Sequence, residues 1–233
     1  MISKKSGIKD LRSSYNKIKP AIKKRLSEFK SFTSDQRVRS EAESPRRGPA
    51  TNDELFGELC FCLMTANANA LKCDEALKVL KAGDHHLKST VSSIRSRIKG
   101  RVRFHNKKAL FIVRARQLFK KGRGLDVKSK IDTKDIISTR DWFVENIKGM
   151  GYKEASHFLR NIGLGRDIAI LDRHILKNLK KYGAIAKVPD SVGSRKVYME
   201  IEDKMRRFSK SVRIPLDELD LLFWSLQTGF IFK

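Results

Sequence analysis

The fold of this chain is decided by the stretch Ile147-Lys148-Gly149-Met150-Gly151-Tyr152-Lys153-Glu154-Ala155. Residues 135–147 have the apolar pattern of a helix, and Gly149 and Gly151 break that helix. Two glycines one residue apart permit positive φ angles and let another backbone approach closely. After them, four apolar residues recur at helical spacing on one face: Ala155, Phe158, Leu159 and Ile162. The sequence therefore predicts a helix, a tight turn and a second helix.

This turn is suited to bind a phosphate through its backbone, because a helix N-terminus is positive and presents N–H groups. Gly149 and Gly151 are therefore candidates for contacting the backbone of a nucleic acid. Lys153 lies two residues after Gly151, at the mouth of the turn. Asp172 follows nineteen residues after Lys153, and we expect it to fold back beside the lysine.

The charge of the chain indicates a polyanionic partner. Its 233 residues include 51 Lys and Arg against 26 Asp and Glu, which gives a net charge of +25 and a pI near 10.2. Such a field is typical of nucleic-acid-binding proteins, and an enzyme of small metabolites does not need it. Binding to a membrane surface is the competing interpretation, but the basic residues are spread along the chain rather than gathered on one amphipathic helix.

The sequence contains no recognisable membrane segment or export signal. No apolar run approaches the roughly 18 residues that a transmembrane helix needs. The basic N-terminus, Met1-Ile2-Ser3-Lys4-Lys5, is not followed by the apolar region of a secretory signal. We therefore expect a cytoplasmic monomer that has no membrane partner.

The hairpin, the lysine and the aspartate together resemble the helix-hairpin-helix DNA glycosylase superfamily. Its signature is an apolar-Gly-apolar-Gly hairpin, a lysine two residues after the second glycine, and a distal aspartate. Two strings resemble the archaeal and bacterial 8-oxoguanine DNA glycosylase/AP lyase family of the second type: Gly151 to Gly163, and Leu171 to Ile175. The resemblance extends from about Glu54 to the end, and it implies a prokaryotic, nucleoid-associated enzyme acting on double-stranded DNA with 8-oxoguanine or abasic sites.

The fold is expected to be all-α, since helical spacing recurs and no segment alternates convincingly as a strand. Asp53 is predicted to cap one helix and Pro215 to open the last one. The resemblance implies a two-lobed helix-hairpin-helix glycosylase fold with the active site in the cleft between the lobes. The expected lobes are 53–164, which ends in the hairpin, and 1–52 together with 165–233. The polar residues 33–52 are predicted to form a connecting loop.

Cysteine and histidine usage gives no sign of a metal site. Cys60 and Cys62 lie in an apolar helical stretch, where a free thiol behaves as a small hydrophobe. No fourth ligand accompanies them and Cys73 at a zinc spacing, and the adjacent His85 and His86 are predicted to lie in an exposed turn. The C-terminal half contains no cysteine, so the chain cannot build the four-cysteine iron–sulfur loop of endonuclease III-type relatives. The resemblance implies at most a monovalent cation on the hairpin carbonyls.

The chemistry implied by the resemblance is removal of a damaged base followed by strand cleavage. A base in a duplex has to be extruded before its sugar is attacked. Asp172 is the candidate for stabilising the positive charge that grows on the deoxyribose. Lys153 is the candidate nucleophile, which attacks C1′ and forms a Schiff base that permits β-elimination. An amine has to be neutral to attack, and burial and a helix N-terminus both favour that form.

Four further residues are candidates for binding the DNA or the damaged base. The resemblance implies that Trp224 and the α-carboxylate of Lys233 line the base pocket, and the two residues keep the family's spacing of nine. Phe104 lies in a basic string that resembles the same family and could stack a base, with core packing as the open alternative. Asn67 aligns with a residue that fills the gap left by the flipped base, and a turn or helix cap is its alternative.

Two other functions stay open at this point. A helix-hairpin-helix module without catalysis would explain the charge and the glycines, but not the match of Lys153 and Asp172. A glycosylase for a different oxidised base is the second alternative, and the ending with Trp224 and Lys233 argues against it. Borohydride trapping on abasic DNA would separate an enzyme from a binding module.

Overall fold

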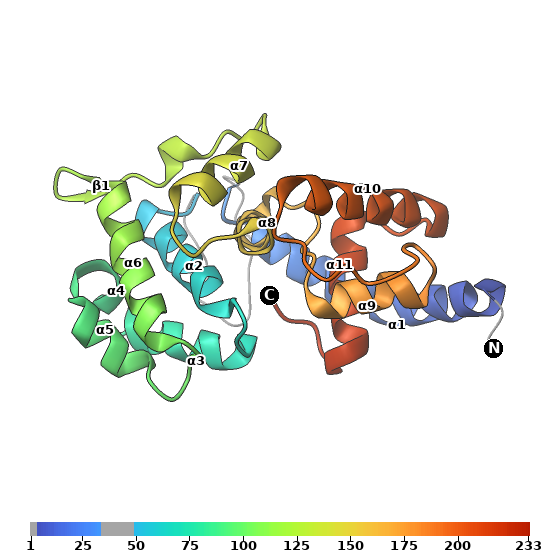
Figure 1. Cartoon of the computed structure of the whole chain (residues 1–233), viewed down its shortest axis with the longest axis horizontal. Coiled ribbons are helices and arrows are strands. Elements are labelled where there is room, and N and C mark those ends of the chain that lie inside the picture. The colour runs from blue at the N-terminus through green and yellow to red at the C-terminus, as the bar shows by residue number, and fades with distance from the viewer. Residues whose placement is uncertain (1–3, 34–48) are drawn as a thin grey trace. The chain divides into compact units, whose positions relative to one another are not determined.

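The computed structural model describes residues 4–33 and 49–233, so most of the predicted connecting loop lies outside the described residues. Helices make up nearly all of the regular structure (Figure 1), as expected for an all-α fold. The exception is a short antiparallel hairpin of β1 (Lys120–Lys121) and β2 (Gly124–Leu125). In the described part of the chain, no helix is both long and apolar enough to cross a membrane.

The chain divides into two compact units, each of which is described by itself. Unit 1 combines Met1–Gly48 with Gly163–Lys233, and unit 2 is the continuous segment Pro49–Ile162. The lobes expected from the sequence, 53–164 and the two flanking segments, stay a prediction.

Unit 2 is built around helix α2 (Asn52–Thr65), of which eleven residues are buried. Helices α3, α6 and α8 all contact it. The other elements of this unit are α3 (Ala70–Lys81), α4 (His85–Lys88), α5 (Val91–Ile98), α6 (His105–Phe119), the 3-10 turn η1 (Lys128–Lys130), α7 (Ile136–Asn146) and α8 (Tyr152–Leu159). A π-helical turn, η2 (Arg160–Leu164), follows α8 and crosses the boundary to unit 1.

The hairpin predicted from the glycines is formed by α7 and α8. The four residues expected on the apolar face of the second helix are all fully buried, namely Ala155, Phe158, Leu159 and Ile162. The rings of Phe143 in α7 and Phe158 in α8 lie 5.0 Å apart, centroid to centroid. The apolar periodicity of the sequence therefore predicted this packing correctly.

The start of α2 corrects one prediction. Thr51 caps the helix, and not Asp53: the Glu54 N–H donates to the Thr51 hydroxyl at 3.2 Å, and the Thr51 N–H donates to the Glu54 carboxylate at 2.7 Å. This reciprocal pair is a capping box, which requires an acidic residue three positions after the cap. Glu54 stands three positions after Thr51, so the N-cap of the helix is two residues earlier than the predicted Asp53.

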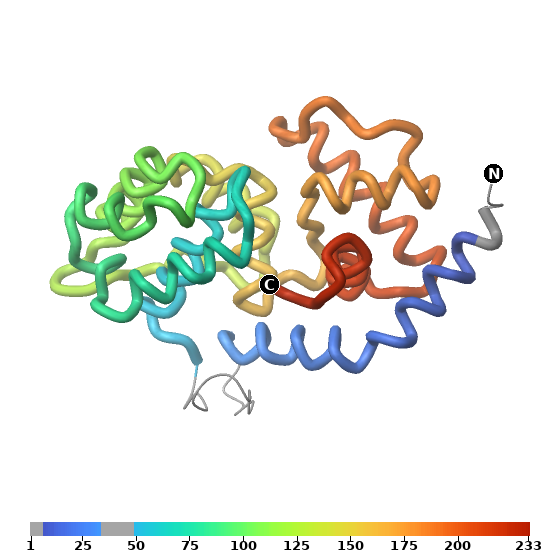
Figure 2. Tube along the Cα trace, turned by 90° about the horizontal axis from the view of Figure 1, so that it is seen from below, coloured from blue at the N-terminus to red at the C-terminus, as the bar shows by residue number. Residues whose placement is uncertain are grey.

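Unit 1 consists of α1 (Lys4–Lys30), α9 (Arg173–Lys181), α10 (Arg195–Val212) and α11 (Leu216–Thr228), together with part of η2. Helix α1 runs as one long helix through Pro20 (Figure 2) and contacts α11, where the Tyr15 hydroxyl donates to Glu218 at 2.5 Å. The rings of Tyr182 and Phe223 stack with centroids 5.6 Å apart. Residues from the two ends of the sequence therefore share one core.

The cysteines and the adjacent histidines lie in the core of unit 2. Cys60, Cys62 and Cys73 are buried free thiols, as predicted for the first two. The prediction of an exposed turn is wrong for His86, which is buried and stacks on the Phe56 ring at 6.4 Å. Burial lowers the pKa of His86, so the ring packs as a neutral group. Among the described residues, no group of three or more His, Cys, Asp or Glu could hold a metal ion.

Candidate active site

The turn between α7 and α8 depends on Gly149. This residue has a φ of +91°, and a Cβ at this position would lie 2.2 Å from the Phe111 ring, so any side chain would be both strained and blocked. Gly151 differs from the expectation, because its φ of −98° is not in the left-handed region and it serves as the extended N-cap of α8. The Met150 N–H donates to the Ile147 carbonyl at 3.1 Å. A monovalent cation at this turn would have to share that oxygen or use other carbonyls.

Lys153 is the second residue of α8, in the first turn after Gly151. Its side chain is 21% exposed, and its Nζ lies 3.0 Å from Oε1 of the buried Glu154. The ammonium group of Lys153 and the carboxylate of Glu154 therefore form an ion pair at the start of α8. The sequence shows Glu154 as an acidic residue directly after the candidate nucleophile, but its ion pair with Lys153 is visible only in the structure.

Lys108 is a buried lysine close enough to Lys153 for their charges to interact. Its Nζ donates to the carbonyl oxygens of Met64 at 2.5 Å and Ala66 at 2.6 Å, at the C-terminal end of α2. The pKa of Lys108 is lowered to about 8, mainly because the side chain is buried; the charge of Lys153 also lowers this pKa, while Cys73 and Glu154 act in the opposite direction. The sequence analysis missed this residue, because it lies within a run of basic residues that otherwise face solvent.

Lys108 holds the loop that carries Asn67. Asn67 is exposed, with a left-handed φ of 51°, and it directly follows Ala66. The helix cap that was considered for Asn67 and Asn69 is made by Asn69, whose side chain accepts the Lys72 N–H at 3.1 Å. Asn67 lies in the turn that follows α2, where the Ala68 N–H donates to the Thr65 carbonyl at 3.1 Å, so the turn considered as its alternative is present. The gap-filling role of Asn67 stays a prediction.

Phe104 does not pack in the core. Its side chain is 51% exposed, its φ of 59° is left-handed, and it immediately precedes α6. The guanidinium of Arg103 lies 4.8 Å from the centre of the ring. A bulky aromatic residue in this backbone region is uncommon and is often found at functional sites. The open alternative of core packing is therefore removed, and the role in binding a base stays a prediction.

Asp172, in unit 1, is the N-cap of α9. Its Oδ1 accepts the Ile175 N–H at 2.8 Å. This bond fixes the rotamer of the side chain, and the positive end of α9 favours a carboxylate there. Asp172 therefore caps the N-terminus of a helix in unit 1, and Lys153 lies in the first turn of a helix in unit 2.

The C-terminal residues of unit 1 fold back on Trp224. Helix α11 ends at Gly229, whose φ is +85°. The Trp224 ring then contacts Phe230 edge-on at 5.1 Å and stacks on Phe232 at 6.2 Å. Trp224 and the segment that ends in Lys233 are thus joined in one aromatic cluster, whereas the position of the α-carboxylate relative to a base stays a prediction.

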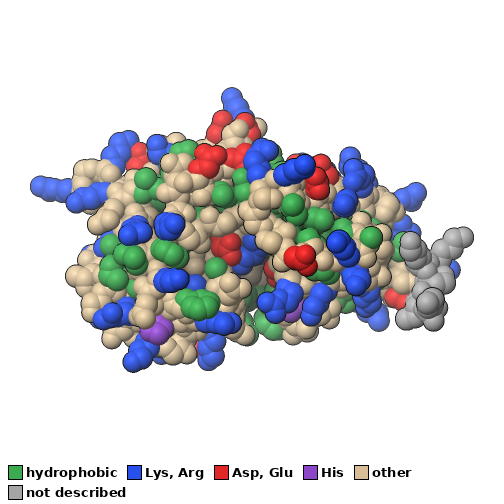
Figure 3. Space-filling model, viewed as in Figure 1, with side chains coloured by type: hydrophobic (Ala, Val, Ile, Leu, Met, Phe, Trp, Pro, Cys, Tyr) green, Lys and Arg blue, Asp and Glu red, His purple; other side chains and the backbone are tan. Residues whose placement is uncertain are grey.

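The surface is basic over a wide area. On the face seen in Figure 3, Lys and Arg side chains are scattered rather than gathered into a single patch. This distribution agrees with the even spread of basic residues along the sequence. It suits a ligand whose charge is extended, such as a phosphate backbone.

Comparisons with known proteins agree on one family. The family model described as 8-oxoguanine DNA glycosylase matches residues 22–214. An 8-oxoguanine DNA glycosylase/AP lyase from Fusobacterium nucleatum is 39% identical over 226 residues, which is 94% of each chain. One from Methanocaldococcus jannaschii is 39% identical over 228 residues, which is 97% of each chain.

Solved structures give the same result. A crystal structure of the 8-oxoguanine DNA glycosylase of Methanocaldococcus jannaschii matches with a TM-score of 0.77 and covers 97% of this chain and 95% of its own. A structure of an 8-oxoguanine glycosylase/lyase from the same organism, in complex with a 15mer DNA containing 8-oxoguanine, matches with a TM-score of 0.80 at 37% identity, covering 97% of this chain and 99% of its own.

Proposed function

Because this chain belongs to the 8-oxoguanine DNA glycosylase family of the helix-hairpin-helix type, we propose that it excises 8-oxoguanine from double-stranded DNA and cleaves the resulting abasic site. The observation that carries this proposal is the position of Lys153, in the first turn of α8 directly after the turn that Gly149 requires. A primary amine beside N–H groups suited to a phosphate is what a Schiff-base lyase needs.

In the proposed mechanism, Lys153 loses a proton and its neutral amine attacks C1′ of the extruded nucleotide. The bond between C1′ and the base breaks, and the base leaves with the electron pair. The C1′–O4′ bond then breaks, O4′ takes the electron pair and a proton, and a protonated Schiff base forms between the Lys153 nitrogen and C1′ of the opened sugar. Loss of a C2′ proton then expels the 3′ phosphate by β-elimination, and hydrolysis of the Schiff base returns the free lysine.

Asp172 acts on the first of these steps. Breaking the glycosidic bond builds positive charge on the deoxyribose, and a carboxylate held in place favours that charge without having to reorganise. The bond from the Ile175 N–H supports this role, because it holds the carboxylate in one orientation.

The α-carboxylate of Lys233 is proposed to distinguish 8-oxoguanine from guanine. Oxidation converts N7 of guanine from a hydrogen-bond acceptor into an N–H donor. An acceptor facing N7 therefore binds the oxidised base and leaves itself unpaired against guanine, which costs binding energy. The contacts of Trp224 with Phe230 and Phe232 support this proposal, because they tie the last residues to the helix that carries Trp224.

The experiment that tests this function is borohydride trapping of the protein on a duplex with a single 8-oxoguanine. We expect a covalent adduct with the native chain and none with Lys153→Gln, which still binds the duplex. Lys148→Gln is the matched control, since Lys148 is an exposed lysine of the same turn. Undiminished trapping by Lys153→Gln, or its loss in Lys148→Gln alone, would refute the assignment.

We also propose that the enzyme works in the cytoplasm as a monomer and needs no iron–sulfur cluster. The three cysteines of the chain are buried free thiols of unit 2. Excision that is unchanged after dialysis against a chelator would support this, and activity that depends on added iron would refute it.

A further inference from the structure

The backbone that leads into Asp172 is buried but belongs to no helix or strand. It comprises residues 168–171, which follow the exposed Asp167 and lie between η2 and α9. Ile168, Ala169, Ile170 and Leu171 are at most 6% exposed. Buried N–H and C=O groups outside regular structure need other partners, because leaving them unpaired is costly. The partners identify the residues that hold this segment.

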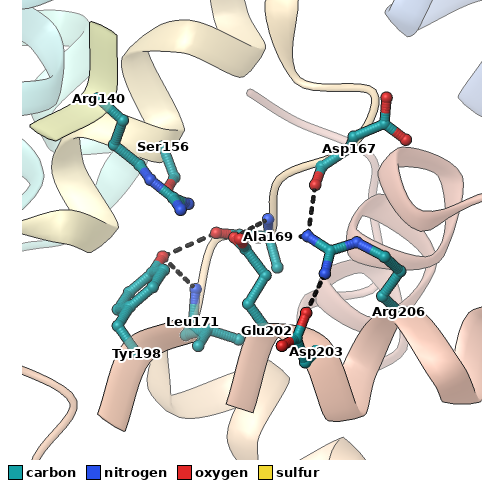
Figure 4. A network of polar contacts seen from close by, with 9 residues as sticks. All are labelled: Arg140, Ser156, Asp167, Ala169, Leu171, Tyr198, Glu202, Asp203 and Arg206. Atoms are coloured by element: carbon teal, nitrogen blue, oxygen red, sulfur yellow. Dashed lines mark hydrogen bonds and ion pairs between the residues drawn. The ribbon is translucent and has the colours of Figure 1, made fainter. Parts of the chain in front are cut away.

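Tyr198 of α10 provides two of these partners with one hydroxyl group. The hydroxyl donates to the Ala169 carbonyl at 2.7 Å and accepts the Leu171 N–H at 3.1 Å (Figure 4). Tyr198 itself is fully buried. One phenol therefore ties both sides of Ile170, two residues before Asp172.

Glu202 and Arg206 continue the same set of contacts along α10. Oε2 of Glu202 accepts the Ala169 N–H at 2.9 Å, and Nη2 of Arg206 donates to the Asp167 carbonyl at 2.9 Å. Nη2 of Arg206 also donates to Oε1 of Glu202 at 3.3 Å. Tyr198, Glu202 and Arg206 are spaced four residues apart, so one face of the helix presents all three. Figure 4 shows them lined up along α10 against the segment.

Asp172 follows this segment in the chain, so the contacts that hold the segment also restrict the position of Asp172. The Asp172 N–H donates to the Ile170 carbonyl at 2.8 Å, and Oδ1 of Asp172 accepts the Ile175 N–H at 2.8 Å. The carboxylate is thus fixed by α9 on one side and, through two residues of backbone, by Tyr198 on the other.

We propose that Tyr198, Glu202 and Arg206 are positioning residues for base excision, which act by holding Asp172 where the charge on the deoxyribose develops. This inference rests on the proposed role of Asp172. A carboxylate stabilises a transition state best when it is already in place, and small displacements are expensive. Their effect should therefore fall on the step that uses Asp172 and not on the chemistry of Lys153.

The test measures single-turnover release of 8-oxoguanine at saturating enzyme with Tyr198→Phe, which keeps the ring and removes the hydroxyl. We expect base release to slow on the order of 10- to 100-fold, while borohydride trapping on a preformed abasic site stays near the native level. Tyr182→Phe is the matched control, because it removes a tyrosine hydroxyl from the same unit without touching this segment. We expect it to leave both rates unchanged.

A double-mutant cycle with Asp172→Asn separates positioning from a general structural effect. If Tyr198 acts through Asp172, adding Tyr198→Phe to Asp172→Asn slows excision no further. Independent, multiplying effects would overturn the inference while leaving the role of Asp172 intact. Native excision by Asp172→Asn alone would instead refute the role of Asp172, and this inference with it.

Two milder variants keep the test decisive if Tyr198→Phe does not fold. Glu202→Gln keeps an oxygen acceptor for the Ala169 N–H, and we expect excision within about threefold of the native rate. Arg206→Met acts at the partly exposed end of the row, and we expect a slowing of several-fold that also disappears in the Asp172→Asn background. A slowing by Arg206→Met that persists in that background would count against the inference.

Discussion

Lys153 and Asp172 both lie at the N-terminal ends of helices, but different contacts hold their side chains. Lys153 is in the first turn of α8 and Asp172 is the N-cap of α9. The positive end of a helix disfavours a cation and favours an anion. The first turn of a helix therefore carries the candidate nucleophile in one case, and the N-cap carries the candidate electrostatic partner in the other.

The two sites differ in what surrounds the side chain. Lys153 forms an ion pair with its neighbour Glu154 at 3.0 Å, and its side chain is 21% exposed. Asp172 is capped by a backbone N–H and preceded by a segment that α10 holds through three side chains. A nucleophile has to change its charge and move during the reaction, whereas an electrostatic partner has to keep both its charge and its place.

The largest expected effect tests the fixed side of this comparison. Asp172→Asn keeps the shape and removes the charge, so base release should slow by about 100-fold or more. Binding to damaged DNA should persist, because no phosphate contact is lost. Single-turnover excision and a binding titration on the same duplex measure the two quantities. Excision at the native rate would mean that a different carboxylate stabilises the sugar.

The next effect concerns Lys108, the buried lysine whose charge interacts with that of Lys153. The pKa of Lys108 is about 8 in the folded protein against 10.5 for a free lysine. Between these values the unfolded chain binds more protons, so Lys108 makes the free energy of unfolding rise with pH. From pH 8 to 10.5, the native chain should gain about 2 kcal/mol relative to Lys108→Met. Urea denaturation across this range measures it, and parallel pH profiles would contradict the lowered pKa.

A smaller effect is expected at the end of the chain. Appending a few residues after Lys233 moves the α-carboxylate away from the base, so excision of 8-oxoguanine should fall by about tenfold. Cleavage of a preformed abasic site should stay nearly unchanged, since no base is read. Trp224→Ala should give the same pattern if its ring lines the pocket. Unchanged discrimination between 8-oxoguanine and guanine in the extended chain would exclude the carboxylate.

The smallest expected effect tests the ion pair between Lys153 and Glu154. Glu154→Gln removes the ion pair with Lys153, which has to break before the amine can attack. Trapping on abasic DNA near pH 6 should become faster by roughly threefold, the size expected for a partly exposed ion pair. Slower trapping at every pH would show that Glu154 helps the reaction by accepting the proton of Lys153.

The sequence predicted those parts of the site that depend on neighbouring residues. The two hairpin helices, the turn and the buried face of α8 follow from local periodicity and from the glycines. The contacts that hold the site were not predictable in this way, because their partners are far apart in the chain. Lys108 and Met64 are separated by 44 positions, and Tyr198 and Ala169 by 29. His86 was misjudged for the same reason, since its burial depends on Phe56.

The discontinuity of unit 1 has a consequence for the synthesis of the protein on the ribosome. Unit 2 is one continuous segment, whereas unit 1 needs α1 from the start of the chain and α11 from near its end. A nascent chain can therefore complete unit 2 while α1 still lacks its partner. Limited proteolysis of ribosome-bound chains stalled between α9 and α10 should release a protected fragment close to 49–162. Full protection of α1 should appear only after α11 has emerged.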